Sequence, residues 1–92
     1  MKFLKPSSQY KKDYKRYRNN PVKVKKLNEI LHKLANEEPL PENNYPHMLT
    51  GNYKGYMECH IEGDFLLIWF DPHTDEIDLV RLGSHSEVFK KN

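Results

Sequence analysis

Three imidazoles and one carboxylate are the side chains of this sequence that are best suited to proton transfer: His47, His60, Asp64 and His85. Histidine titrates near neutral pH and can act as a general base or a general acid. Cleavage of an RNA phosphodiester without a metal needs a base for the 2′-hydroxyl, an acid for the 5′-oxygen leaving group, and positive charge near the phosphate. These residues are candidates for such chemistry if the fold brings them together.

The same histidines have alternative uses. Taken singly, each histidine fits an ordinary surface or hydrogen-bonded position better, and we expect that role for His32 and His73. Zinc sites built from close-paired ligands are not indicated, because the gaps from His47 to His60 and from His60 to His85 do not match such motifs. The sequence therefore predicts no metal site.

Cys59 is the single cysteine of the chain, so it cannot form an internal disulfide. Neighbouring residues of a strand point to opposite faces, so Cys59 and His60 are a poor nucleophile and base pair. We expect Cys59 in the core. The N-terminus lacks an apolar stretch long enough for a signal peptide or a membrane span, and we expect a reducing, cytoplasmic location.

Ninety-two residues are enough for one core, so we treat residues 1–92 as a single domain. The net charge of +2 conceals two halves of opposite sign. Residues 1–36 hold 11 Lys and Arg against two acids, whereas residues 37–92 hold four against 11. A basic half of this kind favours a polyanionic partner. On charge alone, a solvated helix surface explains it equally well.

The basic half has the periodicity of two helices after a short strand at residues 1–4. Pro6-Ser7-Ser8 offers a turn and an N-cap for the first helix, and Asn20-Pro21 offers the second helix an N-cap followed by proline at the first helical position. Helical spacing predicts that the tyrosines of the first helix form a buried stripe rather than a base-stacking surface. The apolar positions are Tyr10, Tyr14 and Tyr17 in the first helix and Val24, Leu27, Leu31 and Leu34 in the second.

The acidic half begins with a loop at residues 37–46 and then has the patterning of a three-stranded meander. From Tyr53 the period is two, with Met57, Cys59 and Ile61 on one side and Tyr56, Glu58 and His60 on a polar, ionisable side. Residues 64–70 form an apolar central strand, and residues 76–82 a third strand. That strand would carry Ile77, Leu79 and Arg81 on one side, before a short basic tail.

We therefore predict an α+β fold in which an N-terminal strand and a two-helix hairpin pack on one face of a twisted antiparallel sheet. The candidate catalytic residues would line the other face or its edge. The hairpin between the first two strands of the meander would place His60 near Asp64, and alignment of the third strand would bring His85 towards the same edge.

Two stretches resemble the YafQ-type members of the RelE toxin superfamily. The first is PHMLTGNYKGY, from Pro46 to Tyr56, followed by Glu58-Cys59-His60-Ile61 and Asp64. The second is RLGSHSEVF, from Arg81 to Phe89. The likeness covers about half of the chain by motif and nearly all of it by order of elements. It departs at Tyr53, where the family often has tryptophan.

This resemblance implies a RelE-like, ribosome-dependent endoribonuclease that cleaves translated messenger RNA by attack of the 2′-hydroxyl. Its active site would use the residues that match His47, His60, Asp64, His85 and Phe89. From their chemistry we assign His47 as the general base, with Asp64 as the competing candidate, and His85 as the general acid.

The remaining expected roles concern RNA binding. His60 would hold the phosphate with help from Arg81 and Lys54, and Phe89 would either stack on a base or anchor the tail to the core. The basic helices would contact ribosomal RNA through Lys11, Lys12, Lys15 and Arg16.

The resemblance also implies a toxin of a type II toxin–antitoxin system. Its partners would be a DinJ/RelB-like antitoxin in a hetero-oligomer, the ribosome and messenger RNA, with no cofactor, no metal and no membrane. One alternative is a ParE-type toxin of the same superfamily, which inhibits DNA gyrase by binding alone. A second alternative is a non-catalytic RNA-binding module that uses the basic helices. A pure binder does not need the histidine set, so substitution of His85 separates these hypotheses.

Overall fold

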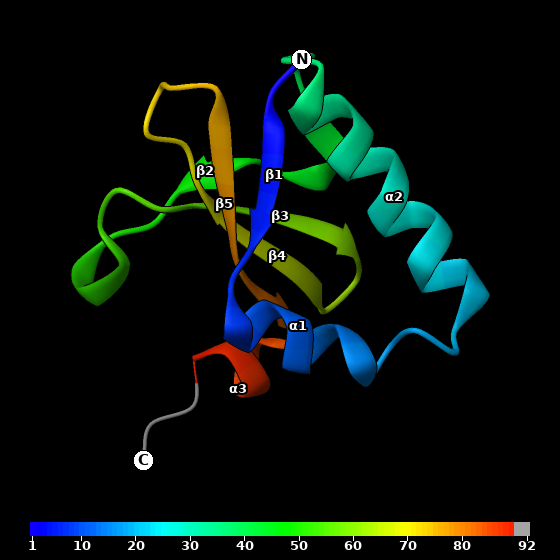
Figure 1. The fold of residues 1–92 in the computed structure, drawn as a ribbon. Coiled ribbons are helices and arrows are strands. Elements are labelled where there is room, and N and C mark those ends of the chain that lie inside the picture. The colour runs from blue at the N-terminus through cyan, green and yellow to red at the C-terminus, as the bar shows by residue number, and fades with distance from the viewer. Residues whose placement is uncertain (90–92) are drawn as a thin grey trace.

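The computed structural model describes residues 1–89 and has the predicted α+β architecture. Figure 1 shows the elements in chain order. They are β1 (Phe3–Pro6), α1 (Ser8–Lys15), α2 (Pro21–Ala35), the 3-10 turn η1 (Glu42–Asn44), β2 (His47–Met48), the 3-10 turn η2 (Gly51–Tyr53), β3 (Met57–Glu62), β4 (Phe65–Phe70), β5 (Glu76–Gly83) and α3 (His85–Val88).

Both long helices start where the sequence predicts. The Ser7 hydroxyl accepts a hydrogen bond from the Tyr10 N–H at the start of α1, and the Asn20 side chain accepts one from the Lys23 N–H at the start of α2. These caps satisfy N–H groups that the first helical turn leaves without partners. Within residues 1–89, no helix combines the length and the apolar character that crossing a membrane requires.

The sheet has five strands in the order β1-β5-β4-β3-β2, and the predicted antiparallel meander is confirmed as β3, β4 and β5. The rest of the sheet differs from the expected antiparallel one in two ways. The first strand begins at Phe3 rather than Met1 and pairs with β5 in parallel, so the sheet is mixed. A short additional strand, β2, pairs antiparallel with β3 and places His47 opposite Glu58. Sequence patterning missed β2 because two residues are too few to show a period.

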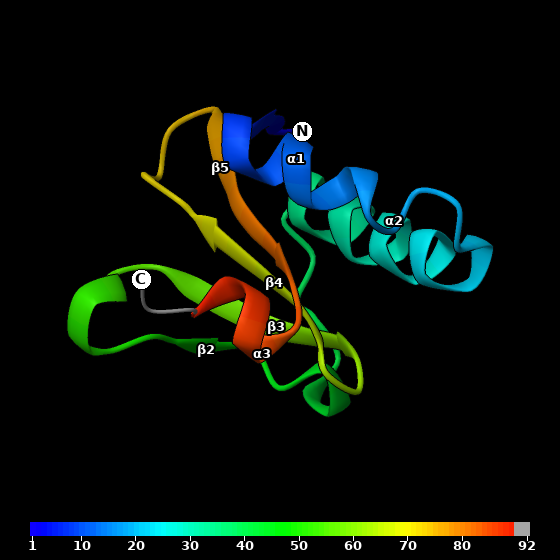
Figure 2. The same ribbon diagram turned by 90° about the horizontal axis from the view of Figure 1, so that it is seen from below.

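One face of the sheet carries the main core, covered by α1 and α2. Figure 2 shows these helices on one side of the strands and α3 on the other. The predicted tyrosine stripe is confirmed, because Tyr10 is buried and Tyr14 and Tyr17 pack against the core. Cys59 is fully buried, as expected. The core also includes Leu27, Ile30 and Leu34 from α2 and Ile61, Leu67, Trp69, Ile77, Leu79 and Leu82 from the sheet.

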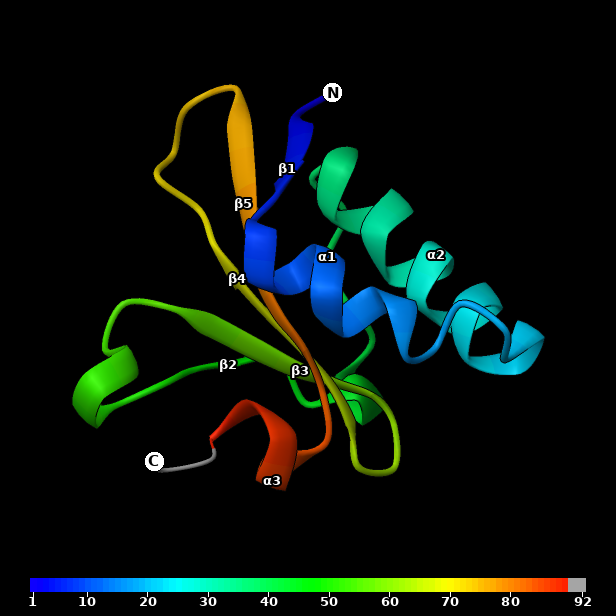
Figure 3. The same ribbon diagram turned by 60° about the horizontal axis from the view of Figure 1, so that its bottom comes forward.

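A short helix, α3, stands where the sequence suggested only a tail. Ser84 and Glu87 form a reciprocal capping box, which stabilises the first turn of α3. Val88 is 1% exposed, so α3 is anchored to the protein rather than projecting from it (Figure 3). The predicted basic tail, Lys90 and Lys91, lies outside the described residues. This corrects the expectation that irregular chain follows β5 directly.

A bulge between β4 and β5 changes the side on which Arg81 lies. The sequence alternation placed Arg81 with Ile77 and Leu79, but Arg81 pairs with Ile68, whereas the next β4 residue, Trp69, pairs with Leu79. Directly opposite residues of antiparallel strands share a face, and alternation along β4 puts Ile68 on the face opposite that of the core residue Trp69. Arg81 is therefore turned to the face on which α3 packs.

Candidate functional site

The sheet face opposite the main core carries the predicted ionisable residues. Glu58 and His60 project from β3 to this face because they alternate with the core residues Cys59 and Ile61. β2 supplies His47 from the neighbouring edge, and α3 supplies His85 from above the face. Three elements that are distant in sequence thus converge on one surface.

Glu58 lies between the histidines and was not among the residues predicted from sequence. It is 2% exposed, and its Oε1 atom lies 3.2 Å from His47 Nε2 and 3.8 Å from His60 Nε2. Its Oε2 atom has no hydrogen-bond partner among residues 1–89. A buried carboxylate requires compensating partners, and imidazoles carrying protons can supply them. The one available signal was the placement of Glu58 on the ionisable side of its strand.

His47 is oriented from both ends of its imidazole ring. Its Nδ1 atom donates a hydrogen bond of 2.8 Å to the Tyr45 carbonyl oxygen, and its Nε2 atom faces Glu58. A carbonyl can only accept, so this contact assigns the proton to Nδ1. In the neutral tautomer, Nε2 is then the basic nitrogen, and it becomes a donor to Glu58 only when the ring carries a second proton.

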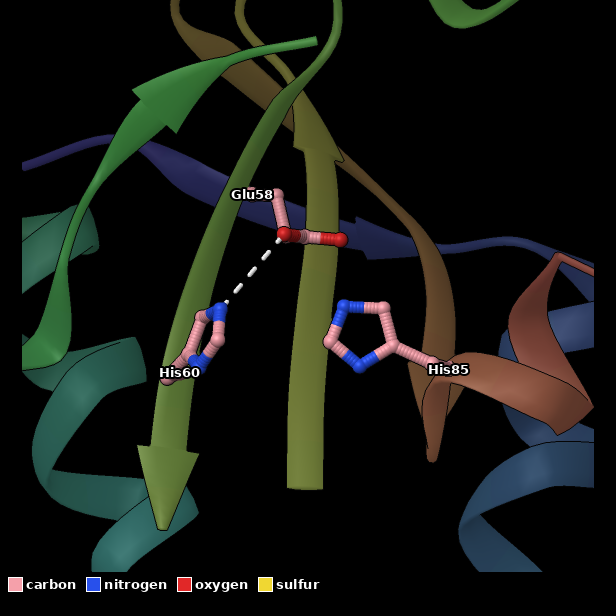
Figure 4. Close-up of side chains that lie close together, drawn as sticks. All are labelled: Glu58, His60 and His85. Carbon is pink, nitrogen blue, oxygen red and sulfur yellow. Dashed lines mark ion pairs between the residues drawn. The ribbon is translucent and has the colours of Figure 1, made fainter. Parts of the chain in front are cut away.

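His85 and Asp64 form the second ionisable pair of the site. Asp64 Oδ1 accepts hydrogen bonds from the His85 backbone N–H at 3.1 Å and from His85 Nδ1 at 2.6 Å. These two bonds hold the pKa of Asp64 below its usual range, and the backbone bond has the larger effect. The pair fixes the ring of His85, and Figure 4 shows its other nitrogen facing Glu58 and His60.

The rings of the site follow one another across the face in a continuous order. Centroid separations are 6.4 Å from His47 to His60, 5.7 Å from His60 to His85 and 5.9 Å from His85 to Phe89. Phe89 is held in an edge-to-face contact by Tyr53, whose hydroxyl also reaches the Val88 carbonyl oxygen. Tyr53, the position that departs from the family pattern, thus supports the end of this row.

The expected phosphate-binding residues have different surroundings. Arg81 donates to both Asp13 oxygens and to the carbonyl oxygens of Glu87 and Val88, so hydrogen bonds occupy four of its five N–H groups. Lys54 is exposed at the end of η2. Lys11, Lys12, Lys15 and Arg16 are exposed on α1 or just after it, apart from the histidines, and Arg16 also lies near Asp13 and Glu87.

Cys59 is unsuited to nucleophilic chemistry, as expected from its position. Burial, and then the nearby charge of Glu58, raise the pKa of its thiol to about 12. A thiol with such a pKa is protonated at neutral pH and is a poor nucleophile.

Glu58, His60 and His85 can also hold a metal ion. Their ligand atoms lie within 4.8 Å of one another, and imidazole with carboxylate is a donor set suited to copper or zinc. Spacing along the sequence did not reveal this set, because its members come from β3 and α3. The site therefore has two chemical capacities, proton transfer and metal coordination.

Comparison with known protein families and sequences gives consistent matches. Residues 2–90 match the family model described as the bacterial toxin of type II toxin–antitoxin systems, YafQ. The chain is 44% identical over 64 residues to a putative toxin YafQ of Haemophilus influenzae, a match that covers 66% of this chain and 63% of that protein. It is 35% identical over 85 residues to the mRNA interferase toxin YafQ of Escherichia coli K12, covering 90% of each.

Solved structures show the same fold. A copper-bound mutant toxin from Helicobacter pylori superposes with a TM-score of 0.88 and 37% identity, covering 97% of this chain and 100% of that one. The toxin in the E. coli DinJ-YafQ complex superposes with a TM-score of 0.82 and 31% identity, covering 97% of this chain and 99% of that one.

Proposed function

Because the chain belongs to the YafQ family of bacterial toxins of type II toxin–antitoxin systems, we propose that it is an endoribonuclease that cleaves messenger RNA on the ribosome. The E. coli relative is named an mRNA interferase. The observation that carries the proposal is the convergence of three imidazoles and two carboxylates on one sheet face. Within this group, His85 Nδ1 lies 2.6 Å from Asp64 Oδ1.

In this mechanism His47 removes the proton of the 2′-hydroxyl through Nε2. The 2′-oxygen then attacks the phosphorus, and the bond from phosphorus to the 5′-oxygen breaks. His85 gives its proton to that leaving oxygen, so the products are a 2′,3′-cyclic phosphate and a 5′-hydroxyl. Each proton transfer by a positioned group typically contributes about 10²–10⁴-fold to the rate.

The two carboxylates then have orienting roles. Asp64, the competing candidate for the base, accepts hydrogen bonds from His85, which suits it better to holding the imidazolium of the acid. Glu58 would orient His47 and His60. A protonated His60, which lies between His47 and His85, would offset the negative charge that develops on the phosphorane. Arg81 and Lys54 would add positive potential from a longer distance.

Substitution of His85 tests the proposal. His85 is exposed at the first turn of α3, so His85→Ala should change stability by only about a few tenths of a kcal/mol. Loss of the acid should lower cleavage of ribosome-bound message by ~10²–10⁴-fold. His73→Ala, in the turn before β5, is the matched control and should cleave normally. Cleavage at the normal rate by folded His85→Ala would refute the assignment.

The same variants address the gyrase-inhibiting alternative. A ParE-type toxin acts by binding and does not require histidines. Growth inhibition that survives in His85→Ala, together with loss of DNA supercoiling by gyrase, would favour that alternative. Growth inhibition lost in step with cleavage favours the ribonuclease.

We also propose a DinJ-like antitoxin as partner, since the E. coli relative was solved as a DinJ-YafQ complex. An acidic, foldable segment is suited to a chain whose first 36 residues are strongly basic. The purified complex should be inert towards translated messages. Equal cleavage by the complex and the free toxin would exclude inhibition by this partner.

Proton transfer by two imidazoles needs no metal, and we propose that cleavage is metal-independent. Copper or zinc bound to Glu58, His60 and His85 would occupy the nitrogen lone pairs and inhibit. In ribosome assays at constant Mg²⁺, a chelator selective for copper and zinc should leave the rate unchanged or raise it, whereas added Cu²⁺ should lower it. A rate that falls with the chelator and returns with Cu²⁺ would refute metal independence.

A further inference from the structure

Tyr45 is a large aromatic residue that lies at the rim of the site and is not used by the mechanism above. It is 63% exposed, whereas Tyr10 in the core is 6% exposed. It follows η1 and has φ 49° and ψ 55°, a left-handed conformation that bulky residues rarely adopt. The chain therefore presents this ring at the surface from a backbone conformation that needs support.

Three hydrogen bonds supply that support and tie Tyr45 to the site. The Tyr45 N–H donates to the Glu42 carbonyl oxygen at 2.9 Å, and the Asn44 amide donates to the His60 carbonyl oxygen at 2.8 Å. The Tyr45 carbonyl oxygen accepts from His47 Nδ1 at 2.8 Å. The residue is thus fixed relative to both β2 and β3.

The Tyr45 ring touches imidazoles rather than core residues. Its centroid lies 4.7 Å from that of His47 in a tilted contact and 5.8 Å from that of His60 in an edge-to-face contact. Tyr45, His47 and His60 therefore form a triangular cluster of rings at the end of the site opposite Phe89. From this cluster the rings continue through His85 to Phe89, so one end of the site has Tyr45 and the other end has Phe89.

We propose that Tyr45 stacks on the base of the nucleotide whose 2′-hydroxyl attacks, an inference that rests on the ribonuclease function proposed above. His47, as the base, must lie beside that nucleotide, and His85, as the acid, must lie beside the nucleotide that follows the cleaved bond. The Tyr45 ring packs against His47 and His60, and the Phe89 ring packs against His85. The two aromatic residues would therefore stack on the bases on either side of the scissile phosphate.

Stacking suits a site that binds single-stranded RNA. Single-stranded RNA is commonly bound by splaying its bases onto aromatic side chains. Every base has a flat face, so stacking confers affinity with little sequence selection, and one stacked base typically contributes roughly 5- to 150-fold to binding. Tyr45 would thus supply substrate affinity and alignment of the attacking sugar, without transferring a proton.

Variants at Tyr45 distinguish the role of the aromatic ring from that of the left-handed backbone conformation at this position. Tyr45→Asn removes the ring and keeps the backbone, because asparagine enters the left-handed region more readily than most residues. Tyr45→Phe keeps the ring. Phe3→Thr is the matched control, since Phe3 is 71% exposed on β1, at the far edge of the sheet from β2.

The assay uses ribosomes programmed with a message that carries 2-aminopurine, a fluorescent base that still pairs with uridine. The probe occupies the position 5′ of the mapped cleavage site, and a 2′-deoxy sugar there blocks cleavage. Wild type, Tyr45→Phe and Phe3→Thr should change its emission on binding, and Tyr45→Asn should not. With unmodified message, Tyr45→Asn should lower kcat/KM by roughly tenfold, within the 5- to 150-fold range of one stacked base.

A probe moved to the 3′ side of the cleaved bond should respond equally to wild type and Tyr45→Asn and should lose its response in Phe89→Ala. Native emission change and native kcat/KM in Tyr45→Asn would overturn the proposal. If Tyr45→Asn bound the antitoxin more weakly but gave the same emission change as wild type, the ring would belong to the antitoxin interface, and the stacking proposal would also be overturned. If the wild type cleaved no message, the ribonuclease function would fail, whereas cleavage by the wild type together with a native emission change in Tyr45→Asn would overturn the stacking role alone.

Discussion

Replacement of Asp13 by asparagine should destabilise the protein and disturb the site at the same time. Asp13 is fully buried on α1. It accepts hydrogen bonds from Arg81 Nε at 2.9 Å, the Leu82 N–H at 3.0 Å and the Gln9 amide at 3.2 Å. Burial would raise the pKa of Asp13, but the bonds from Arg81 and Leu82 outweigh it and hold the pKa below its usual range.

The magnitude follows from the environment of the pair. Removing one partner of a buried ion pair typically costs about 3–5 kcal/mol, because the other charge is left without compensation. The Arg81 side chain is 19% exposed, so water relieves part of that penalty. We therefore expect Asp13→Asn to lower the free energy of unfolding by about 2–4 kcal/mol, a large part of the ~5–15 kcal/mol that stabilises a typical domain.

The effect on the site follows from the second role of Arg81. Its guanidinium also donates to the carbonyl oxygens of Glu87 and Val88, at 3.1 Å and 3.3 Å, and so fixes the end of α3. His85 belongs to α3 and Phe89 follows it directly. Asp13→Asn should therefore also reduce cleavage at temperatures where the protein is still folded.

Urea unfolding followed by circular dichroism measures the stability change, and an unchanged m-value shows that the folded and unfolded states remain comparable. Arg16→Ala is the control, because Arg16 lies 3.5 Å from the same carboxylate but is 48% exposed and should cost less than about 1 kcal/mol. The double variant Asp13→Leu with Arg81→Met should recover part of the loss. A cost below about 1 kcal/mol for Asp13→Asn would refute the reasoning.

Three further predictions concern the helices and pH. Ser84→Ala removes the cap of α3 and should cost about 1 kcal/mol in urea unfolding, whereas Ser86→Ala should be neutral, and equal effects would count against the capping box. The native pKa values of Asp13, Asp71 and Glu87 are lowered, so the stability they contribute is present above their unfolded pKa values of about 4 and should be lost as pH falls further. Asp13→Asn should flatten this acid dependence, and an unchanged slope would show that Asp13 is not its source. Reversal of Lys11, Lys12 and Lys15 to glutamate should weaken sedimentation with ribosomes and leave unfolding unchanged, whereas unaltered sedimentation would remove α1 as the contact.

The sequence determined the local structure of this protein. Side-chain caps and helical spacing specified where α1 and α2 begin and which faces they bury, because these signals act within a few residues. Alternation along β3 likewise assigned Cys59 and His60 to opposite faces of the sheet. The family motifs identified the histidines and Asp64 as the candidate catalytic residues, although they assigned no distances.

Only the tertiary structure decided the features that depend on strand pairing. The parallel pairing of β1 with β5, the two-residue strand β2 and the bulge that turns Arg81 towards α3 have no local signature, because register is set by partners distant in the chain. Glu58 is an ordinary polar position in its own strand. It becomes the buried centre of the site only because β2 brings His47 to it and α3 brings His85 over the same face. The sequence specifies which functional groups the side chains carry. Packing of the elements sets the burial and the neighbours that change how those groups behave.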